Sequence, residues 1–146
     1  MIGYFKYNQK MNRLFSEKMS VRDKFARSIR KAQKEKKSKN DIEALEGQAQ
    51  FEEIMVDEEI AILASDYLIS KAQRSFIQIP LMDLEGMWKK CEIISNRRVL
   101  TTAGIATVRS ALRCETKERA AMWLPILAAL TGIIGSATGL ISIAMK

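Results

Sequence analysis

The sequence of 146 residues contains no histidine and only two cysteines, Cys91 and Cys114. Without histidine there is no Ser-His or Cys-His couple, no histidine-ligated zinc and no imidazole that titrates near neutral pH. Without a second cysteine pair, a zinc ribbon and a disulfide-rich scaffold are excluded. A P-loop, a G-x-G-x-x-G fingerprint and a G-x-S-x-G nucleophile elbow are also absent. We therefore expect no enzyme activity, no cofactor and no metal site.

Charge is absent from one long segment, the 26 residues of 120–145. A helix that crosses a bilayer needs about 20 predominantly apolar residues. Trp123 suits the headgroup level, and Pro125 is expected in the first turn of this helix, where its missing N–H costs least. A buried core helix is the alternative, but the remaining 119 residues offer little core to surround it. The sequence predicts a transmembrane helix over 120–145, whose partner is the lipid bilayer.

Positive charge is distributed unequally around this segment. Arg109, Arg113, Lys117 and Arg119 precede it, whereas only Lys146 follows it. The positive-inside rule then predicts a single-pass, tail-anchored protein with its amino-terminal body in the cytoplasm, as in a bacterial inner membrane. Three of these residues recur at every fourth position, which indicates a basic stripe at the membrane surface. The stripe would set topology alone or also contact anionic headgroups.

Small residues recur on one face of the predicted transmembrane helix, at spacings of 4, 3, 4 and 3. They are Ala128, Gly132, Gly135, Gly139 and Ser142. Small side chains let two helix backbones approach closely, so this face predicts a helix–helix interface and a homo-oligomer. Pairing with another membrane protein is an alternative, as is the ordinary abundance of glycine in membrane helices.

Two charge blocks of opposite sign lie next to each other in the amino-terminal half. Residues 22–40 contain nine basic and two acidic side chains, and residues 41–59 contain eight acidic and no basic ones. An antiparallel hairpin folded at residue 40 would place position 22 near 58 and position 31 near 49. The acidic residues Glu52, Glu53, Asp57, Glu58 and Glu59 would then face a basic partner on an exposed helix. The alternatives are a nucleic acid, an anionic lipid, or another subunit's acidic block.

Apolar residues recur at helical spacing through both blocks. Residues 9–38 contain Met11, Leu14, Phe15, Val21, Phe25, Ile29 and Ala32, and residues 41–77 contain Phe51, Met55, Ile62, Ile69 and Phe76. This periodicity predicts two amphipathic helices with a break at 38–40, the second helix being capped by Asn40 or Asp41. We therefore expect a coiled-coil-like hairpin over residues 1–78.

The pattern changes to a short extended module over residues 79–100. Two strands are predicted at 87–94 and 97–100, with a turn at 95–96, and Trp88 is expected to be a packing residue. Lys89 and Lys90 beside Cys91 favour a lowered thiol pKa, although no general base accompanies this cysteine. Thr101 or Thr102 is expected to cap a juxtamembrane helix over 101–119.

The segment Arg98-Val-Leu-Thr-Thr-Ala-Gly-Ile-Ala-Thr-Val-Arg109 resembles one part of winged-helix DNA-binding domains, in which a strand leaving the wing enters Leu-Thr-x-x-Gly and a final helix. The resemblance covers about a dozen residues and implies DNA binding. The upstream helix-turn-helix of that family is not apparent, and a strand that enters a capped helix accounts for the same residues.

Together these patterns predict a mainly α fold with a small β-hairpin and one carboxyl-terminal transmembrane helix. The predicted function is a non-enzymatic tail-anchored interaction platform that self-associates through its membrane helix, with a membrane or cytoplasmic protein as its partner. One alternative is a small pore-forming or membrane-disrupting effector, similar to holins or abortive-infection toxins. The other is a membrane-tethered nucleic-acid binder.

Overall fold

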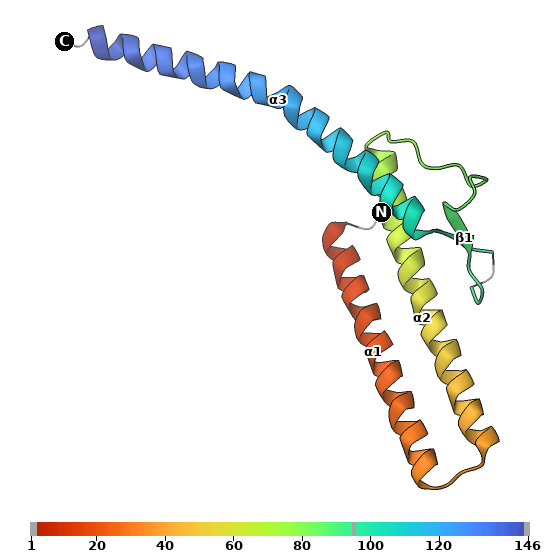
Figure 1. The fold of residues 1–146 in the computed structure, drawn as a ribbon. Coiled ribbons are helices and arrows are strands. Elements are labelled where there is room, and N and C mark those ends of the chain that lie inside the picture. The colour runs from red at the N-terminus through yellow and green to blue at the C-terminus, as the bar shows by residue number, and fades with distance from the viewer. Residues whose placement is uncertain (1–2, 95, 145–146) are drawn as a thin grey trace. The chain divides into compact units, whose positions relative to one another are not determined.

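The computed structural model describes residues 3–94 and 96–144, and in its last helix it describes side chains as far as Thr131. The protein is mainly helical, with α1 (Tyr4–Lys34), α2 (Lys39–Arg74), β1 (Trp88–Lys90), β2 (Arg98–Leu100) and α3 (Thr102–Ala144) (Figure 1). The chain divides into two compact units, which we call unit 1 (Met1–Val108) and unit 2 (Arg109–Lys146). The boundary falls inside α3, and each unit is described separately below.

The two long helices α1 and α2 pack side by side in an antiparallel hairpin, as the charge blocks predict (Figure 1). The rings of Tyr7 and Tyr67 stack with centroids 4.0 Å apart near the open end of the hairpin. Farther along, the Arg22 guanidinium pairs with the Glu53 carboxylate at 2.9 Å. The hairpin is therefore confirmed, but the predicted register, with position 22 near 58, is wrong by about five residues.

The turn between these helices explains the shifted register. Lys36 adopts a left-handed backbone conformation with φ 52°, and the backbone N–H of Lys37 donates to the carbonyl of Ala32, which closes the end of α1. The Ser38 hydroxyl accepts from the Asp41 backbone N–H at 3.2 Å and donates to the Asp41 carboxylate at 2.8 Å. This reciprocal cap starts α2 earlier than expected, so the predicted cap at Asn40 or Asp41 is wrong.

Helix α2 packs on two sides, so a single apolar stripe does not describe it. The predicted stripe fails at both ends, because Phe51 is 53% exposed and Phe76 lies beyond the helix with 95% of its surface exposed. The buried residues of α2 are instead Val56, Glu58, Leu63, Ser65, Leu68 and Ala72. At 100° per residue these point around much of the helix. Burial by α1 on one side and by the β-hairpin on the other accounts for this spread.

The two strands form an antiparallel pair with Trp88 opposite Leu100 and Lys90 opposite Arg98. The predicted hairpin is thus confirmed, but the first strand ends at Lys90 instead of reaching residue 94. The reason is that the backbone N–H groups of residues 92–94 donate to a side chain of α2. Trp88 is half-buried and its indole N–H donates to the Pro80 carbonyl at 3.1 Å.

Helix α3 starts with the expected threonine cap, since the Gly104 backbone N–H donates to the Thr101 hydroxyl at 3.2 Å. Gly104 passes so close to the residue before β1 that a Cβ there would collide with the Met87 carbonyl oxygen. The helix continues without a break to Ala144, so Pro125 lies inside it. The predicted helix start near residue 120, with Pro125 in a first turn, is therefore wrong. Between Gly104 and Pro125 the sequence contains no further glycine or proline that would end the helix.

Candidate interaction surfaces

The β-hairpin is attached to α2 by two side chains, Glu58 and Ser65, which lie two turns apart on one face of the helix. The Glu58 carboxylate accepts hydrogen bonds from the backbone N–H groups of Glu92, Ile93 and Ile94, the last at 2.8 Å. The Ser65 hydroxyl accepts from the Leu100 backbone N–H at 2.9 Å, and both of these residues are buried. Two polar side chains of one helix therefore hold the loop between the strands and the second strand.

The surroundings of Glu58 favour its charged form. Burial alone raises the pKa of this carboxyl, but hydrogen bonds from the backbone N–H groups of Ile94, Glu92 and Ile93 outweigh it, and the positive charge of Lys89 adds to them. The net effect lowers the pKa of Glu58 below its usual range. Glu58 was predicted on an exposed helix face opposite basic residues; the structure instead buries it beneath the β-hairpin, with 6% of its surface exposed.

Cys91 lies in the same loop and its environment disfavours a thiolate. Burial raises the pKa of the Cys91 thiol, the negative charge of Glu58 raises it further, and Lys89 and Arg97 offset only part of this effect. The predicted lowering by neighbouring lysines is therefore wrong, because the buried thiol also faces a carboxylate. A protonated, buried thiol is a poor nucleophile.

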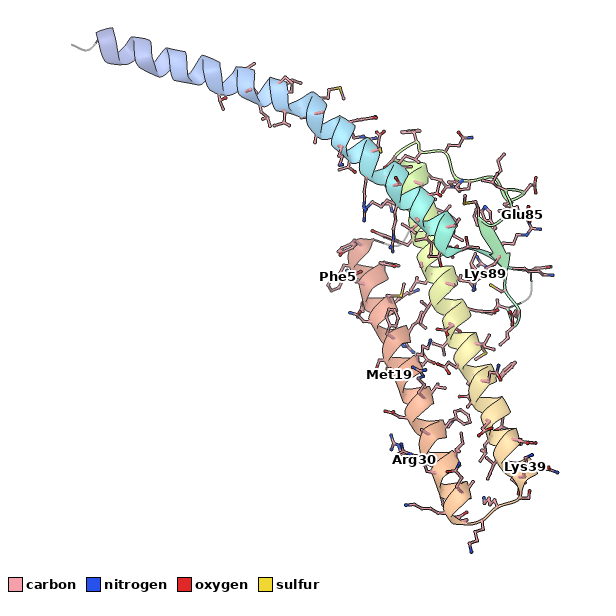
Figure 2. The ribbon with its side chains drawn as sticks, in the orientation of Figure 1. Phe5, Met19, Arg30, Lys39, Glu85 and Lys89 are labelled. Carbon is pink, nitrogen blue, oxygen red and sulfur yellow. The ribbon has the colours of Figure 1, made fainter. Side chains whose placement is uncertain are left out.

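Across the seam of the hairpin, four ion pairs join α1 to α2. Lys18 pairs with Asp57 at 2.6 Å and with Glu53 at 3.8 Å, and Lys24 pairs with Glu52 at 3.8 Å, in addition to the Arg22 pair. In the part of the chain that the structure describes, residues 25–37 make no ion pair with α2; Lys31 and Lys37 contact Glu35 of their own segment instead. Much of the basic block is consequently exposed, including Arg30, which is labelled in Figure 2.

An open groove of about 510 Å³ lies between α1 and α2 within unit 1. Its apolar lining is Leu14, Ile62 and Leu63. Its charged lining comes from both helices: Lys10, Arg13 and Glu17 on α1, and Glu59 and Asp66 on α2. An apolar lining accompanied by charges of both signs is typical of a surface that contacts another protein segment.

In unit 2 the basic stripe predicted from sequence lies on an uninterrupted helix. Arg109, Arg113, Lys117 and Arg119 are all exposed, and the Arg119 guanidinium also bonds the Glu115 carboxylate at 2.6 Å. Of the predicted small-residue face, Ala128 is exposed on α3. The packing of this face beyond Ala128, at Gly132, Gly135, Gly139 and Ser142, lies outside the described residues. Their backbone is helical.

Over the residues whose side chains are described, no helix combines the length and the apolar character that crossing a membrane requires. Within the same residues, no three His, Cys, Asp or Glu side chains gather closely enough to hold a metal ion. Of the residues that organise these surfaces, the sequence patterns missed Glu58 and Ser65. A serine or glutamate inside a helix gives no local signal that distinguishes a ligand of distant backbone N–H groups from a solvated side chain.

Comparison with protein-family models, with curated proteins and with solved structures gives no match for this chain.

Proposed function

We propose that this chain is a non-enzymatic, membrane-anchored interaction protein. The observation that carries the proposal is that the backbone of α3 is helical from Thr102 to Ala144, and that its last part coincides with the 26 uncharged residues of 120–145. At ~1.5 Å per residue this segment would extend about 39 Å, and the hydrocarbon core of a bilayer is about 30 Å thick. Residues 120–145 would therefore cross the membrane once.

The anchor is tested by expressing the full chain, floating it with membranes and extracting those membranes at alkaline pH. We expect the protein to stay in the lipid fraction. Replacing both Leu127 and Leu130 by lysine should release it, because lysine at the centre of a span costs about 2.5–3.5 kcal/mol per residue. The matched control replaces Ala106 and Ser110, two exposed positions on α3 before the apolar segment, by lysine. Extraction of the unaltered chain by alkali would refute the anchor.

The arrangement of charge supports an orientation for this anchor. Arg109, Arg113, Lys117 and Arg119 precede the apolar segment on an exposed helix surface. Basic residues next to a span are retained on the cytoplasmic side, and those near an anionic leaflet gain about 1 kcal/mol each. Unit 1 would therefore be cytoplasmic, and its hairpin would be the interaction platform. The groove between α1 and α2 and the half-exposed Phe51 support a protein partner for it.

Self-association through the small-residue face is the second part of the proposal. Replacing Gly132, Gly135 and Gly139 by leucine should weaken a detergent-resistant oligomer, since bulk on this face prevents close backbone approach. The control introduces leucine on the opposite face through Ala137→Leu and Ala144→Leu, which should leave the oligomer intact. Equal oligomerisation of both variants would refute this interface and would leave the proposed membrane anchor unaffected.

A nucleic-acid partner is the alternative that one observation favours. Arg27, Arg30 and Lys34 are exposed on α1 and have no ion pair with α2 among the described residues. If this face binds RNA or DNA, the detergent-solubilised chain should bind with an affinity that falls steeply as salt rises. Binding that is absent at low salt would remove the alternative.

A further inference from the structure

The most exposed apolar side chains of unit 1 lie toward one end of the helical hairpin, while Phe15, Met19 and Phe51 are half-exposed along the helices. Because α1 and α2 are antiparallel, the start of α1 and the end of α2 lie at the same end, opposite the turn at residues 35–38 (Figure 1). At this end the exposed fraction is 95% for Phe76, 70% for Leu81 and 60% for Met82. Tyr4 and Phe5 are also exposed there, and Figure 2 shows Phe5 directed away from α2. The opposite end presents the lysines of the turn.

Phe76 is held outward by its backbone. It follows α2 with φ 57°, a left-handed conformation that favours glycine, and its N–H donates to the Gln73 carbonyl while the Ile77 N–H donates to the Ala72 carbonyl. A glycine at this position would terminate the helix with less strain. The chain instead places an almost fully exposed aromatic ring there, which indicates a use outside the folded unit.

The segment after Phe76 is fixed in place although its side chains are exposed. The Trp88 indole donates to the Pro80 carbonyl at 3.1 Å, and the Arg98 guanidinium donates to the Met82 carbonyl at 3.3 Å. These contacts anchor the backbone, so the apolar side chains of Leu81 and Met82 are presented outward and do not collapse on the hairpin.

We infer that this end of unit 1, defined by Phe76, Leu81, Met82 and Leu84, inserts into the interfacial layer of the same bilayer that residues 120–145 cross. The inference rests on the proposed anchor. Unit 1 ends at Val108, and the helical residues from there to Ala120 extend only about 18 Å, so the anchor keeps unit 1 near the lipid surface.

The cations near the apolar end favour an anionic lipid surface, although the loop of residues 81–86 itself contains two carboxylates. Asp83 and Glu85 lie in the loop, but four exposed cations lie near it or near the helix ends: Lys6 in the first turn of α1, Lys71 and Arg74 in the last turn of α2, and Arg98, which donates to the Met82 carbonyl. Basic side chains beside inserted aromatic and aliphatic ones are the usual composition of a surface that lies in the headgroup region. The end would be held by its apolar side chains and assisted by these four cations.

The test places an environment-sensitive NBD dye at this end of the full chain. Cys114 is replaced by serine, and Met82→Cys is labelled and reconstituted in phosphatidylcholine vesicles with and without phosphatidylglycerol. The unmodified Cys91 is 5% exposed, so the parent without an added cysteine checks for background labelling. The matched reporter is Lys37→Cys in the turn at the other end. We expect the dye at position 82, and not at 37, to emit at shorter wavelength and to be quenched by doxyl-labelled lipid.

A second variant separates insertion from misfolding. Phe76→Gly removes the ring and suits the left-handed backbone, so it should fold normally and reduce the quenching at position 82. Phe51→Ala removes an exposed ring from the middle of α2 and should not change it. The inference is overturned if the protein binds vesicles but the dye is quenched equally weakly at positions 82 and 37, or more strongly at 37. That result would leave the proposed anchor unaffected. Protein that fails to float with vesicles refutes the anchor and this inference together.

Discussion

Two helix glycines, Gly104 and Gly47, provide a matched pair for testing the packing of α3 on the β-hairpin. A Cβ at position 104 would lie 2.4 Å from the Met87 carbonyl oxygen and 3.0 Å from a Leu100 methyl carbon, whereas a Cβ at position 47 meets nothing within 4 Å. Replacing glycine by alanine inside a helix stabilises by about 0.5–1 kcal/mol. Overpacking a close contact costs about 1–3 kcal/mol. Gly104→Ala should therefore destabilise, and Gly47→Ala should stabilise.

The gain in helix propensity is common to both substitutions, so the overpacking cost should separate the variants, by about 1–3 kcal/mol in free energy of unfolding. With a denaturant slope of about 1–2 kcal/mol per molar urea, their midpoints should differ by at least about 0.5 M. Trp88 in β1 reports the β-hairpin by fluorescence in a Trp123→Phe background, and far-UV circular dichroism follows the helices. If Gly104→Ala proves as stable as the unaltered chain, or if both variants shift the midpoint in the same direction, the close approach of α3 to the strand is wrong.

Three further predictions concern side chains that join the elements. Glu58→Gln should speed amide hydrogen exchange in residues 92–94 at neutral pH. Because folding lowers the pKa of Glu58, its contribution to stability is present above the unfolded pKa of about 4.5 and is lost as pH falls through the folded pKa. The unaltered chain should therefore show the same faster exchange only in acid. Ser65→Ala leaves the buried N–H of Leu100 without its acceptor and should cost about 1–3 kcal/mol in urea unfolding. A double-mutant cycle of Lys18 and Asp57 should give a coupling of about 0.2–1 kcal/mol that shrinks in high salt, since the Asp57 side chain is half-exposed.

Each of these has a contradicting outcome. The control for the first is Glu59→Gln, an exposed neighbour on the same helix that should leave exchange in residues 92–94 unchanged. An equal effect of both glutamines would mean that the charge of α2, and not the contact of Glu58, is responsible. A Ser65→Ala variant within about 0.5 kcal/mol of the unaltered chain would imply that Leu100 finds another partner. A coupling that is insensitive to salt would contradict a solvent-screened ion pair.

Several elements of the fold have local signals that can be recognised in the amino-acid sequence. The opposite charge blocks and helical periodicity predicted the α1–α2 hairpin, and Thr101 before a helical pattern predicted the start of α3. Two extended segments around a short turn predicted the antiparallel strands. These features depend on neighbours a few positions apart, or on charges repeated over many residues, and a linear pattern records both.

Other details depend on groups far apart in the chain and become visible only when the elements pack. The hairpin register follows from the Ser38 cap, and a displacement of about five residues still leaves the basic block beside the acidic one. The role of Glu58 depends on backbone N–H groups 34–36 positions away, which no periodicity encodes. Phe76 continues the seven-residue spacing of Met55, Ile62 and Ile69, but the helix ends two residues earlier and leaves the ring exposed. The pattern fixed which side chains are apolar, and packing decided which of them are covered.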